Sequence, residues 1–97
     1  MNNVKLSYIL SLPNPIIIDI RDSYSYNLGH IDGAINIPYY NLLNNFSHYL
    51  SKYEKYYLYC QNGTQSEEIS KRLNLFGYDT LNIDGGYLEY LKMNKSS

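Results

Sequence analysis

The stretch YLYCQNGTQS, residues 57–66, contains the single cysteine of the chain at a point where the sequence pattern changes. Residues 56–59 form an aromatic and apolar run that is typical of a buried strand. Amide and small side chains then indicate a short loop that starts at Cys60. Apolar residues follow at helical spacing, at Ile69, Leu73 and Phe76. The stretch therefore predicts a strand that turns through a loop into a helix.

Strand and helix patterns alternate along the rest of the chain. Further strands are expected at residues 16–20, 34–37 and 80–83, and further helices at residues 5–12, 38–50 and 87–91. Residues 16–18 are three isoleucines without polar alternation, which predicts a strand covered on both faces. The alternation predicts an α/β fold, with a parallel sheet and helices on both of its faces.

Length and composition narrow the class of protein. A chain of 97 residues is expected to form a single domain, residues 1–97. The net charge of −1 gives no indication of nucleic acid or an anionic membrane as a partner. The longest aliphatic run is far shorter than the ~20 residues of a membrane-spanning helix, and no secretory signal is expected. One cysteine forms no intramolecular disulfide, which favours the cytoplasm.

Cys60 is expected at the carboxyl end of a parallel strand, where such sheets form their ligand sites. Gly63 permits a positive φ, so the N–H groups of the loop can point inward, and the positive end of the next helix faces the sulfur. These donors favour a thiolate, the nucleophilic form, which we expect to lie within reach of solvent. Two other interpretations stay open locally: a buried structural cysteine, or a capping box of Thr64 and Glu67.

Four motifs, taken together, resemble those of the rhodanese-like single-domain sulfurtransferases. Asp19-Ile20-Arg21 resembles D-V/I-R, and residues 29–38, GHIDGAINIP, resemble G-H-I-x-G-A-x-N-I/V/L-P. Residues 60–66 resemble C-x-x-G-x-R-S, and Gly85-Gly86 with Tyr90 resembles G-G-x-x-x-W. The resemblance covers residues 6–91 and implies a small, five-stranded, mainly parallel sheet flanked by helices on both faces.

The resemblance also implies a chemistry. In this family the loop cysteine takes the outer sulfur of a donor such as thiosulfate, becomes a persulfide, and passes the sulfur to an acceptor such as cyanide or a thiol. Cys60 matches the sulfur-carrying position. The donor is expected to be a small sulfur compound or a persulfide-bearing protein, and no metal or organic cofactor is implied. The binding loop would consist of Gln61, Asn62, Gly63, Thr64, Gln65 and Ser66.

The chain departs from the family pattern in its loop. Gln65 stands where the family usually has arginine, and Glu67 and Glu68 follow in the first turn of the expected helix. Both changes make the surroundings of Cys60 less positive. We therefore expect thiosulfate, a dianion, to be a weaker donor than a neutral or protein-bound persulfide.

Other polar residues near the expected site have two interpretations each. Asp19 and Arg21 follow a strand, and they would either orient the loop or an anionic substrate, or form a structural ion pair. His30 would be either a base for Cys60 or, as its G-H-I motif implies, a structural residue.

Two rival functions follow from the same residues. A phosphatase or arsenate reductase of related fold needs C-x5-R, but the sixth residue after Cys60 is Ser66, so this activity is not expected. The second rival is a catalytically weak rhodanese-like module for protein interaction, which the missing loop arginine favours and the retained cysteine opposes.

Overall fold

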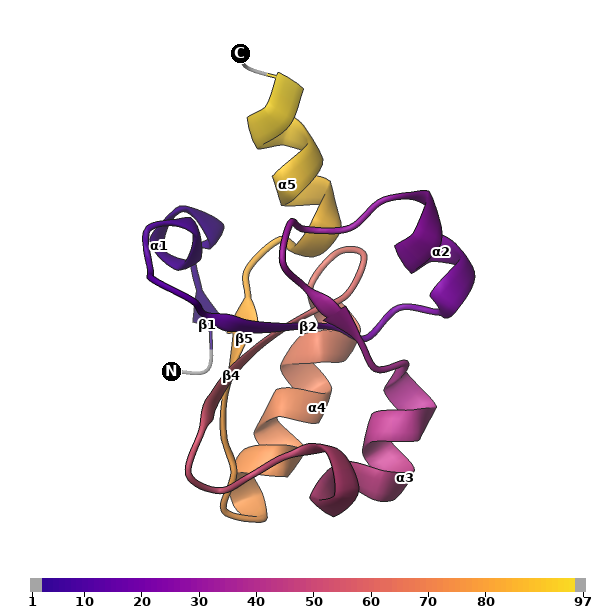
Figure 1. Ribbon diagram of the computed structural model, residues 1–97, viewed down its shortest axis with the longest axis vertical. Coiled ribbons are helices and arrows are strands. Elements are labelled where there is room, and N and C mark those ends of the chain that lie inside the picture. Colours follow the sequence, from indigo (N-terminus) through magenta and orange to yellow (C-terminus); the bar gives the residue numbers. More distant parts are fainter. Residues whose placement is uncertain (1–2, 96–97) are drawn as a thin grey trace.

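The computed structural model describes residues 3–95 as five strands that alternate with five helices (Figure 1). In chain order the elements are β1 (Asn3–Val4), α1 (Leu6–Leu10), β2 (Ile16–Asp19), α2 (Ser23–Leu28), β3 (Ile35–Asn36), α3 (Tyr39–Tyr49), β4 (Lys55–Tyr59), α4 (Thr64–Leu75), β5 (Asp79–Ile83) and α5 (Gly86–Lys95). The sheet has the order β1-β5-β4-β2-β3, and every neighbouring pair is parallel. The predicted α/β fold is confirmed.

Two layers of helices cover the sheet. Figure 1 shows α3 and α4 on one face, and α1 and α5 on the other. Ile18, Leu58 and Ile69 belong to the core under α3 and α4. Leu6 and Ile83 belong to the second core, under α1 and α5. Both faces are therefore apolar, as the isoleucine run of β2 predicted.

Strand β4 lies in the middle of the sheet, between β2 and β5. Its side chains alternate between the two cores: Leu58 packs under α3 and α4, while Tyr57 and Tyr59 pack on the opposite face. Cys60, the next residue, points to the side of Leu58. The alternation thus places the only cysteine of the chain at the carboxyl end of the central strand, beside the start of α4.

The structure differs from the sequence expectation at the edges and on two helices. Strand β1 was not predicted, because two residues are too short to show any periodicity. In α5 the expected apolar positions Leu88 and Leu91 are 45% and 37% exposed. Tyr87 and Tyr90 pack against the core in their place. Phe76 follows the last turn of α4 and is also mainly exposed.

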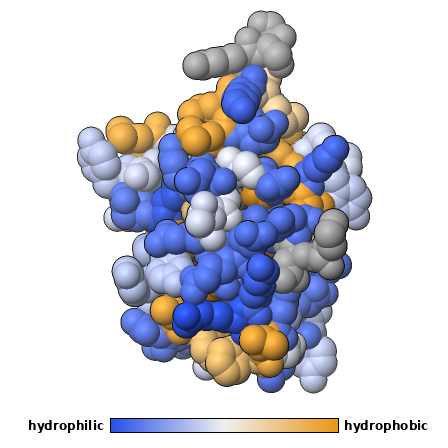
Figure 2. Space-filling model, turned by 180° about the vertical axis from the view of Figure 1, so that it is seen from behind, coloured by the Kyte–Doolittle hydropathy of each residue, from blue (hydrophilic) through white to orange (hydrophobic). Residues whose placement is uncertain are grey.

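Within residues 3–95, no helix has the length and apolar character needed to cross a membrane. From behind, the surface is largely hydrophilic, and its hydrophobic residues lie in small separate groups (Figure 2).

Candidate active site

The sulfur of Cys60 is surrounded by hydrogen-bond donors of the following loop. Its Sγ accepts the backbone N–H groups of Gly63 at 3.1 Å and Ser66 at 3.4 Å. The hydroxyl of Ser66 lies 3.3 Å from the sulfur, and Asn62 Oδ1 lies 4.0 Å away. Gly63 has a φ of 98°, a left-handed conformation that turns its N–H toward the sulfur. The amides thus converge on Cys60, as the loop sequence predicted.

These contacts also cap helix α4. The first N–H groups of a helix have no partner within it. Here the Thr64 N–H donates to Asn62 Oδ1 at 3.1 Å, and the Ser66 N–H donates to the sulfur. The alternative capping box is wrong, because Gly63 is the N-cap and Glu67 therefore lies one position too far along the helix. Glu67 instead accepts a hydrogen bond from Asn3 at 2.8 Å.

The expectation that the sulfur lies within reach of solvent is wrong, since Cys60 is only 3% exposed. Helix α5 covers the loop from the other side. The Tyr87 N–H donates to the Cys60 carbonyl at 2.9 Å, and the Leu88 N–H donates to the Gln61 carbonyl at 3.1 Å. A Cβ atom at Gly86 would lie 2.4 Å from the Cys60 carbonyl oxygen, so only glycine permits this approach. The sulfur is buried, but its amide donors face it.

The loop side chains lie at different depths. Ser66 is buried with the sulfur, and Gly63 is buried beneath the loop. The remaining loop residues are exposed: Gln61, Asn62, Thr64 and Gln65. The predicted loop is therefore brought together around Cys60, with four side chains outside and the sulfur inside.

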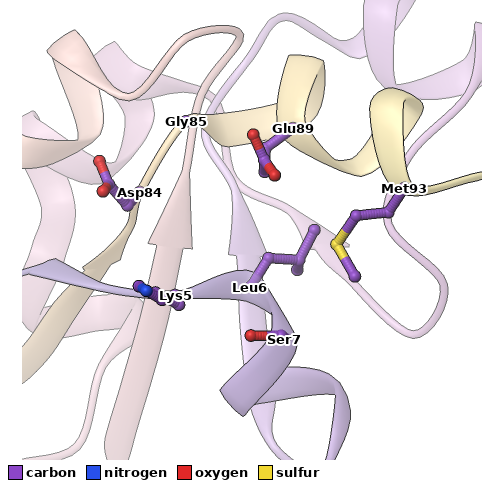
Figure 3. A pocket seen from close by; sticks show the side chains of 7 residues that line it. All are labelled: Lys5, Leu6, Ser7, Asp84, Gly85, Glu89 and Met93. Carbon is purple, nitrogen blue, oxygen red and sulfur yellow. The ribbon is translucent and has the colours of Figure 1, made fainter.

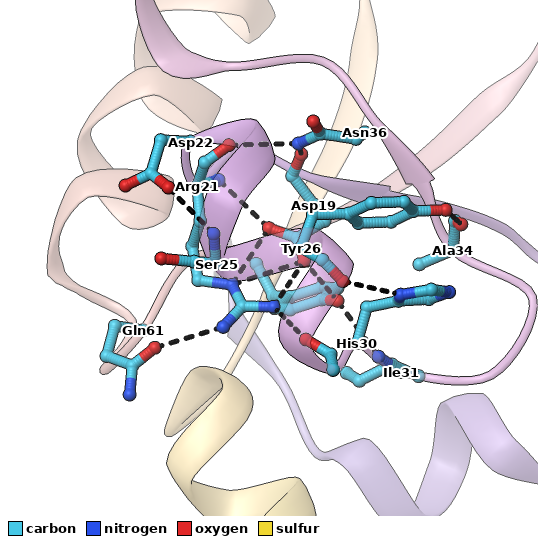
Figure 4. A network of polar contacts seen from close by, with 12 residues as sticks. Asp19, Arg21, Asp22, Ser25, Tyr26, His30, Ile31, Ala34, Asn36 and Gln61 are labelled. Atoms are coloured by element: carbon cyan, nitrogen blue, oxygen red, sulfur yellow. Dashed lines mark hydrogen bonds and ion pairs between the residues drawn. The ribbon is translucent and has the colours of Figure 1, made fainter.

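Asp19 and Arg21 form a buried ion pair at the end of β2, next to the loop (Figure 4). Arg21 Nη2 donates to Asp19 Oδ2 and to the Gly29 carbonyl, both at 2.7 Å. Its Nη1 donates to Gln61 Oε1 at 3.2 Å. Burial disfavours the guanidinium charge, but the hydrogen bond and charge of Asp19 outweigh that effect and raise the pKa of Arg21. The pair has the geometry of a structural ion pair and also contacts the loop.

Tyr59 and Asn36 complete this network. The Tyr59 hydroxyl donates to Asp19 Oδ2 at 2.6 Å and accepts the Ile31 N–H at 3.0 Å. Burial and the bond to Asp19 raise the pKa of Tyr59, which stays protonated. Asn36 donates to the carbonyls of Asp19 and Arg21, both at 2.9 Å, and so satisfies two backbone acceptors. Tyr59 was missed because it looks like any other residue of an aromatic strand.

His30 lies beside α2, and its described contacts are with Tyr26 and not with Cys60. Its Nδ1 is 2.8 Å from the Tyr26 carbonyl oxygen, and its ring stacks on the Tyr26 ring at 3.8 Å between centroids. The Tyr26 hydroxyl in turn donates to the Ala34 carbonyl (Figure 4). These contacts fit the structural interpretation of His30.

A second polar chain starts at Ser66 and was missed entirely by sequence reasoning. The Ser66 hydroxyl donates to Asn82 Oδ1 on β5. Asn82 Nδ2 donates to Asn3 Oδ1 at 3.0 Å, and Asn3 Nδ2 donates to Glu67 Oε2 at 2.8 Å. The sign of these hydrogen bonds in the sequence was Asn82, an amide within an otherwise apolar strand pattern. Such an amide does not by itself reveal its partner.

A cavity of about 440 Å³ lies between α1, α5 and the turn after β5 (Figure 3). Lys5, Asp84 and Glu89 supply its charged groups, and Cys60 does not line it. The cavity is therefore separate from the sulfur. Within residues 3–95, no cluster of three or more histidine, cysteine, aspartate or glutamate side chains is arranged to hold a metal ion.

Comparison with known proteins gives the family. The model of the rhodanese-like domain matches residues 4–93. This chain belongs to the rhodanese-like domain family. The motifs at residues 19–21, 29–38 and 60–66 lie within that match.

Two kinds of curated relative resemble this rhodanese-like chain. The thiosulfate sulfurtransferase GlpE of Tolumonas auensis is 31% identical over 80 residues, which cover 81% of this chain and 74% of GlpE. The tRNA uridine(34) hydroxylase of Buchnera aphidicola is 27% identical over 92 residues, which cover 87% of this chain but 29% of the hydroxylase. The chain thus spans less than a third of that relative.

Solved structures agree with the rhodanese-like fold. A crystal structure of a Staphylococcus saprophyticus protein has a TM-score of 0.83 and 28% identity, and the match covers 93% of each chain. A rhodanese-like domain protein from Staphylococcus aureus has a TM-score of 0.76 and 27% identity, covering 89% of this chain and 87% of that one. The five-stranded parallel sheet is therefore the fold of the family.

Proposed function

We propose that this protein is a sulfurtransferase that carries sulfane sulfur as a persulfide on Cys60, from a donor to a thiophilic acceptor. The observation that carries this proposal is the convergence of the Gly63 and Ser66 N–H groups on the cysteine sulfur. Membership of the family and the similarity to a thiosulfate sulfurtransferase support it. The donor is thiosulfate or another persulfide, and the acceptor is a thiol or cyanide.

The transfer has two displacement steps. The Cys60 thiolate attacks the outer sulfur of the donor, and a new S–S bond forms as the donor bond breaks. With thiosulfate, sulfite leaves with the electron pair. The acceptor then attacks the outer sulfur of the persulfide, and the S–S electrons return to Cys60 as a thiolate. No net oxidant or reductant is consumed.

The loop supports both steps electrostatically. Negative charge is on sulfur before the attack, in the persulfide anion and again after the transfer. Backbone N–H groups that already face the sulfur stabilise this charge without rearranging, and the start of α4 adds its positive dipole. The bend at Gly63 and the first turn of α4 hold these donors in place.

The exposed loop residues supply the contacts to donor and acceptor. Gln61, Asn62, Thr64 and Gln65 project around the buried sulfur. Arg21 positions the Gln61 side chain through its Nη1. Asp19 and Arg21 therefore act as supporting residues and not as the sulfur-binding groups. A reducing compartment such as the cytoplasm would keep Cys60 available.

Intact-mass measurement tests the carrier role. The reduced protein, incubated with thiosulfate or with glutathione persulfide, is expected to gain the mass of one sulfur. A thiol reductant should remove the added mass, and Cys60→Ser should not acquire it. Alkylation with iodoacetamide provides the control that the thiol is reachable. If alkylation proceeds while neither donor adds sulfur, the proposal fails.

The donor preference is tested at position 65. Because Gln65 stands in place of an arginine, Gln65→Arg is expected to raise turnover of thiosulfate severalfold, by attracting the dianion. Gln65→Met has a similar length without charge, so it should give no gain. An equal rate in the wild type and in Gln65→Arg would remove the electrostatic explanation of weak thiosulfate activity.

The alternative is a catalytically weak rhodanese-like module for protein interaction. The burial of Cys60 and the missing loop arginine favour it. The same mass measurement separates the two functions, because an interaction module needs no sulfur adduct.

A further inference from the structure

The Ser66 hydroxyl has one proton and two neighbouring acceptors. Its oxygen is 3.3 Å from the Cys60 sulfur and also donates to Asn82 Oδ1. A serine hydroxyl donates one hydrogen bond at a time. Ser66 and Asn82 are both buried, so water does not supply a substitute partner. The direction of this single proton therefore decides whether Ser66 supports the thiol or the thiolate of Cys60.

The direction of the Ser66 proton is set by Glu67, which lies at the end of this series of hydrogen bonds farthest from Cys60. The Glu67 carboxylate only accepts hydrogen bonds, so Asn3 must present its Nδ2 to Glu67. Asn3 Oδ1 then faces Asn82 and requires the Asn82 Nδ2. Asn82 is left with Oδ1 toward Ser66, and the hydroxyl proton of Ser66 goes to that oxygen. The lone pairs of the Ser66 oxygen are left facing the sulfur.

We propose that Glu67, acting through Asn3 and Asn82, is a positioning residue that turns the Ser66 proton away from Cys60 in the resting protein. The described acceptor of the Cys60 S–H is Asn62 Oδ1, at 4.0 Å. A thiolate or a persulfide anion instead needs the Ser66 proton, which must then leave Asn82. This inference rests on the proposed sulfur-carrying role for its purpose, although its test does not require sulfur transfer.

Other charged groups near the loop have different partners. Arg21, at the end of β2, is bound to Asp19, Gly29 and Gln61. On α4, Glu68 pairs with Arg72 at 2.9 Å and accepts from the Tyr39 hydroxyl. Lys5, Asp84 and Glu89 line the separate cavity beside α5. Among these groups, Glu67 is the one that the described hydrogen bonds join to Ser66.

Removing the Asn3 side chain, at the exposed end of this series of hydrogen bonds, tests the proposal without changing a core residue. Asn3→Ala changes no charge and leaves Asn82 free to turn its amide toward Ser66. The Ser66 proton then points to the sulfur. The rate of Cys60 alkylation by iodoacetamide at neutral pH is expected to rise about three- to tenfold, the typical net effect of one hydrogen bond. The pH profile of that rate should move to lower pH.

Glu67→Gln should act in the same direction, because a glutamine side chain both donates and accepts. Glu68→Gln is the matched control, since it removes the same charge from the same turn of α4. The described bonds of Glu68 are to Tyr39 and Arg72, outside the series that leads to Ser66. In a Ser66→Ala background, the effect of Asn3→Ala should vanish and that of Glu67→Gln should fall to a purely electrostatic remainder. Circular dichroism checks that each variant is folded.

Unchanged or slower alkylation in Asn3→Ala would overturn the proposal, and so would an increase that persists in full in Ser66→Ala. Alkylation requires no sulfur donor. If Asn3→Ala does not change the alkylation rate but the protein still gains one sulfur, only the positioning role is rejected. If the alkylation profile shifts but no sulfur is added, only the sulfur-carrying role is rejected.

Discussion

Two buried polar networks meet at the carboxyl edge of the sheet, and they differ in how completely their protons are assigned. At the end of β2, Asp19 accepts from the Arg21 side chain, from the Arg21 backbone and from Tyr59. Every donor there has a fixed acceptor. At the end of β4, the single proton of Ser66 faces both Cys60 and Asn82.

The difference separates a structural network from a chemical one. A fully satisfied buried network is rigid and costly to break, because removing one partner leaves another charge or dipole without compensation. A network with one proton for two acceptors can redirect that hydrogen bond by turning a hydroxyl, and so can follow a change of charge on the neighbouring sulfur. The network at the end of β2 therefore stabilises the fold, and the network at the end of β4 contains the reactive cysteine, Cys60.

Removing Arg21 should have the largest effect on stability. Arg21→Ala leaves the Asp19 carboxylate buried without its counter-ion, and the expected loss of unfolding free energy is about 3–5 kcal/mol. Urea unfolding followed by circular dichroism measures it. The control is Arg72→Ala, which breaks an exposed ion pair with Glu68 and should cost at most about 1 kcal/mol. Equal losses in the two variants would contradict the structural role of the β2 network.

Gly86→Ala should disturb the network around Cys60 by displacing helix α5, which packs on the Cys60 loop. The new Cβ would collide with the Cys60 carbonyl, and we expect a loss of about 1–3 kcal/mol. The displaced loop should also let a bulky aromatic disulfide reagent reach Cys60 faster. Gly33→Ala is the matched control, because Gly33 also has a positive φ but has open space around it. The idea fails if Gly33→Ala is equally destabilising and equally reactive.

The smallest expected effect lies at the exposed rim of the β2 network. Asp22 caps α2 by accepting the Ser25 N–H at 2.8 Å, and this hydrogen bond lowers the pKa of Asp22 below its usual value of 3.8. A lowered pKa in the folded state means that the stabilisation is complete above pH 3.8 and is lost as the pH falls through the folded value.

Asp22→Asn keeps the capping oxygen but does not titrate. The wild type should therefore melt at a slightly higher temperature than Asp22→Asn near neutral pH, and the two melting temperatures should converge in acid. Scanning calorimetry across this pH range provides the measurement. A difference that grows as the pH falls would show that the sign is wrong.

The sequence predicted the frame of the molecule well, because that frame depends on local patterns. The isoleucines of β2 and the aromatic run of β4 were long enough to indicate buried parallel strands. The turn at Gly63 was readable because glycine there has a direct conformational purpose. Asp19 and Arg21 are two residues apart, so their pairing was within the range of a motif.

Neither the burial of the sulfur nor the series of hydrogen bonds from Ser66 to Glu67 could be predicted from the sequence, because both depend on contacts between distant segments. The double glycine before Tyr87 matched a family motif, but the fit of Gly86 against the Cys60 carbonyl follows from the packing of α5. Asn3 and Asn82 are neighbours only through the pairing of β1 with β5. A two-residue strand has no periodicity that would have revealed this register.

The bonds from α5 to the Cys60 and Gln61 carbonyls set an order of events during translation. Residues 86–88 lie far after Cys60 in the chain, so the bonds that close the Cys60 loop form only after α4 and β5 have been synthesised.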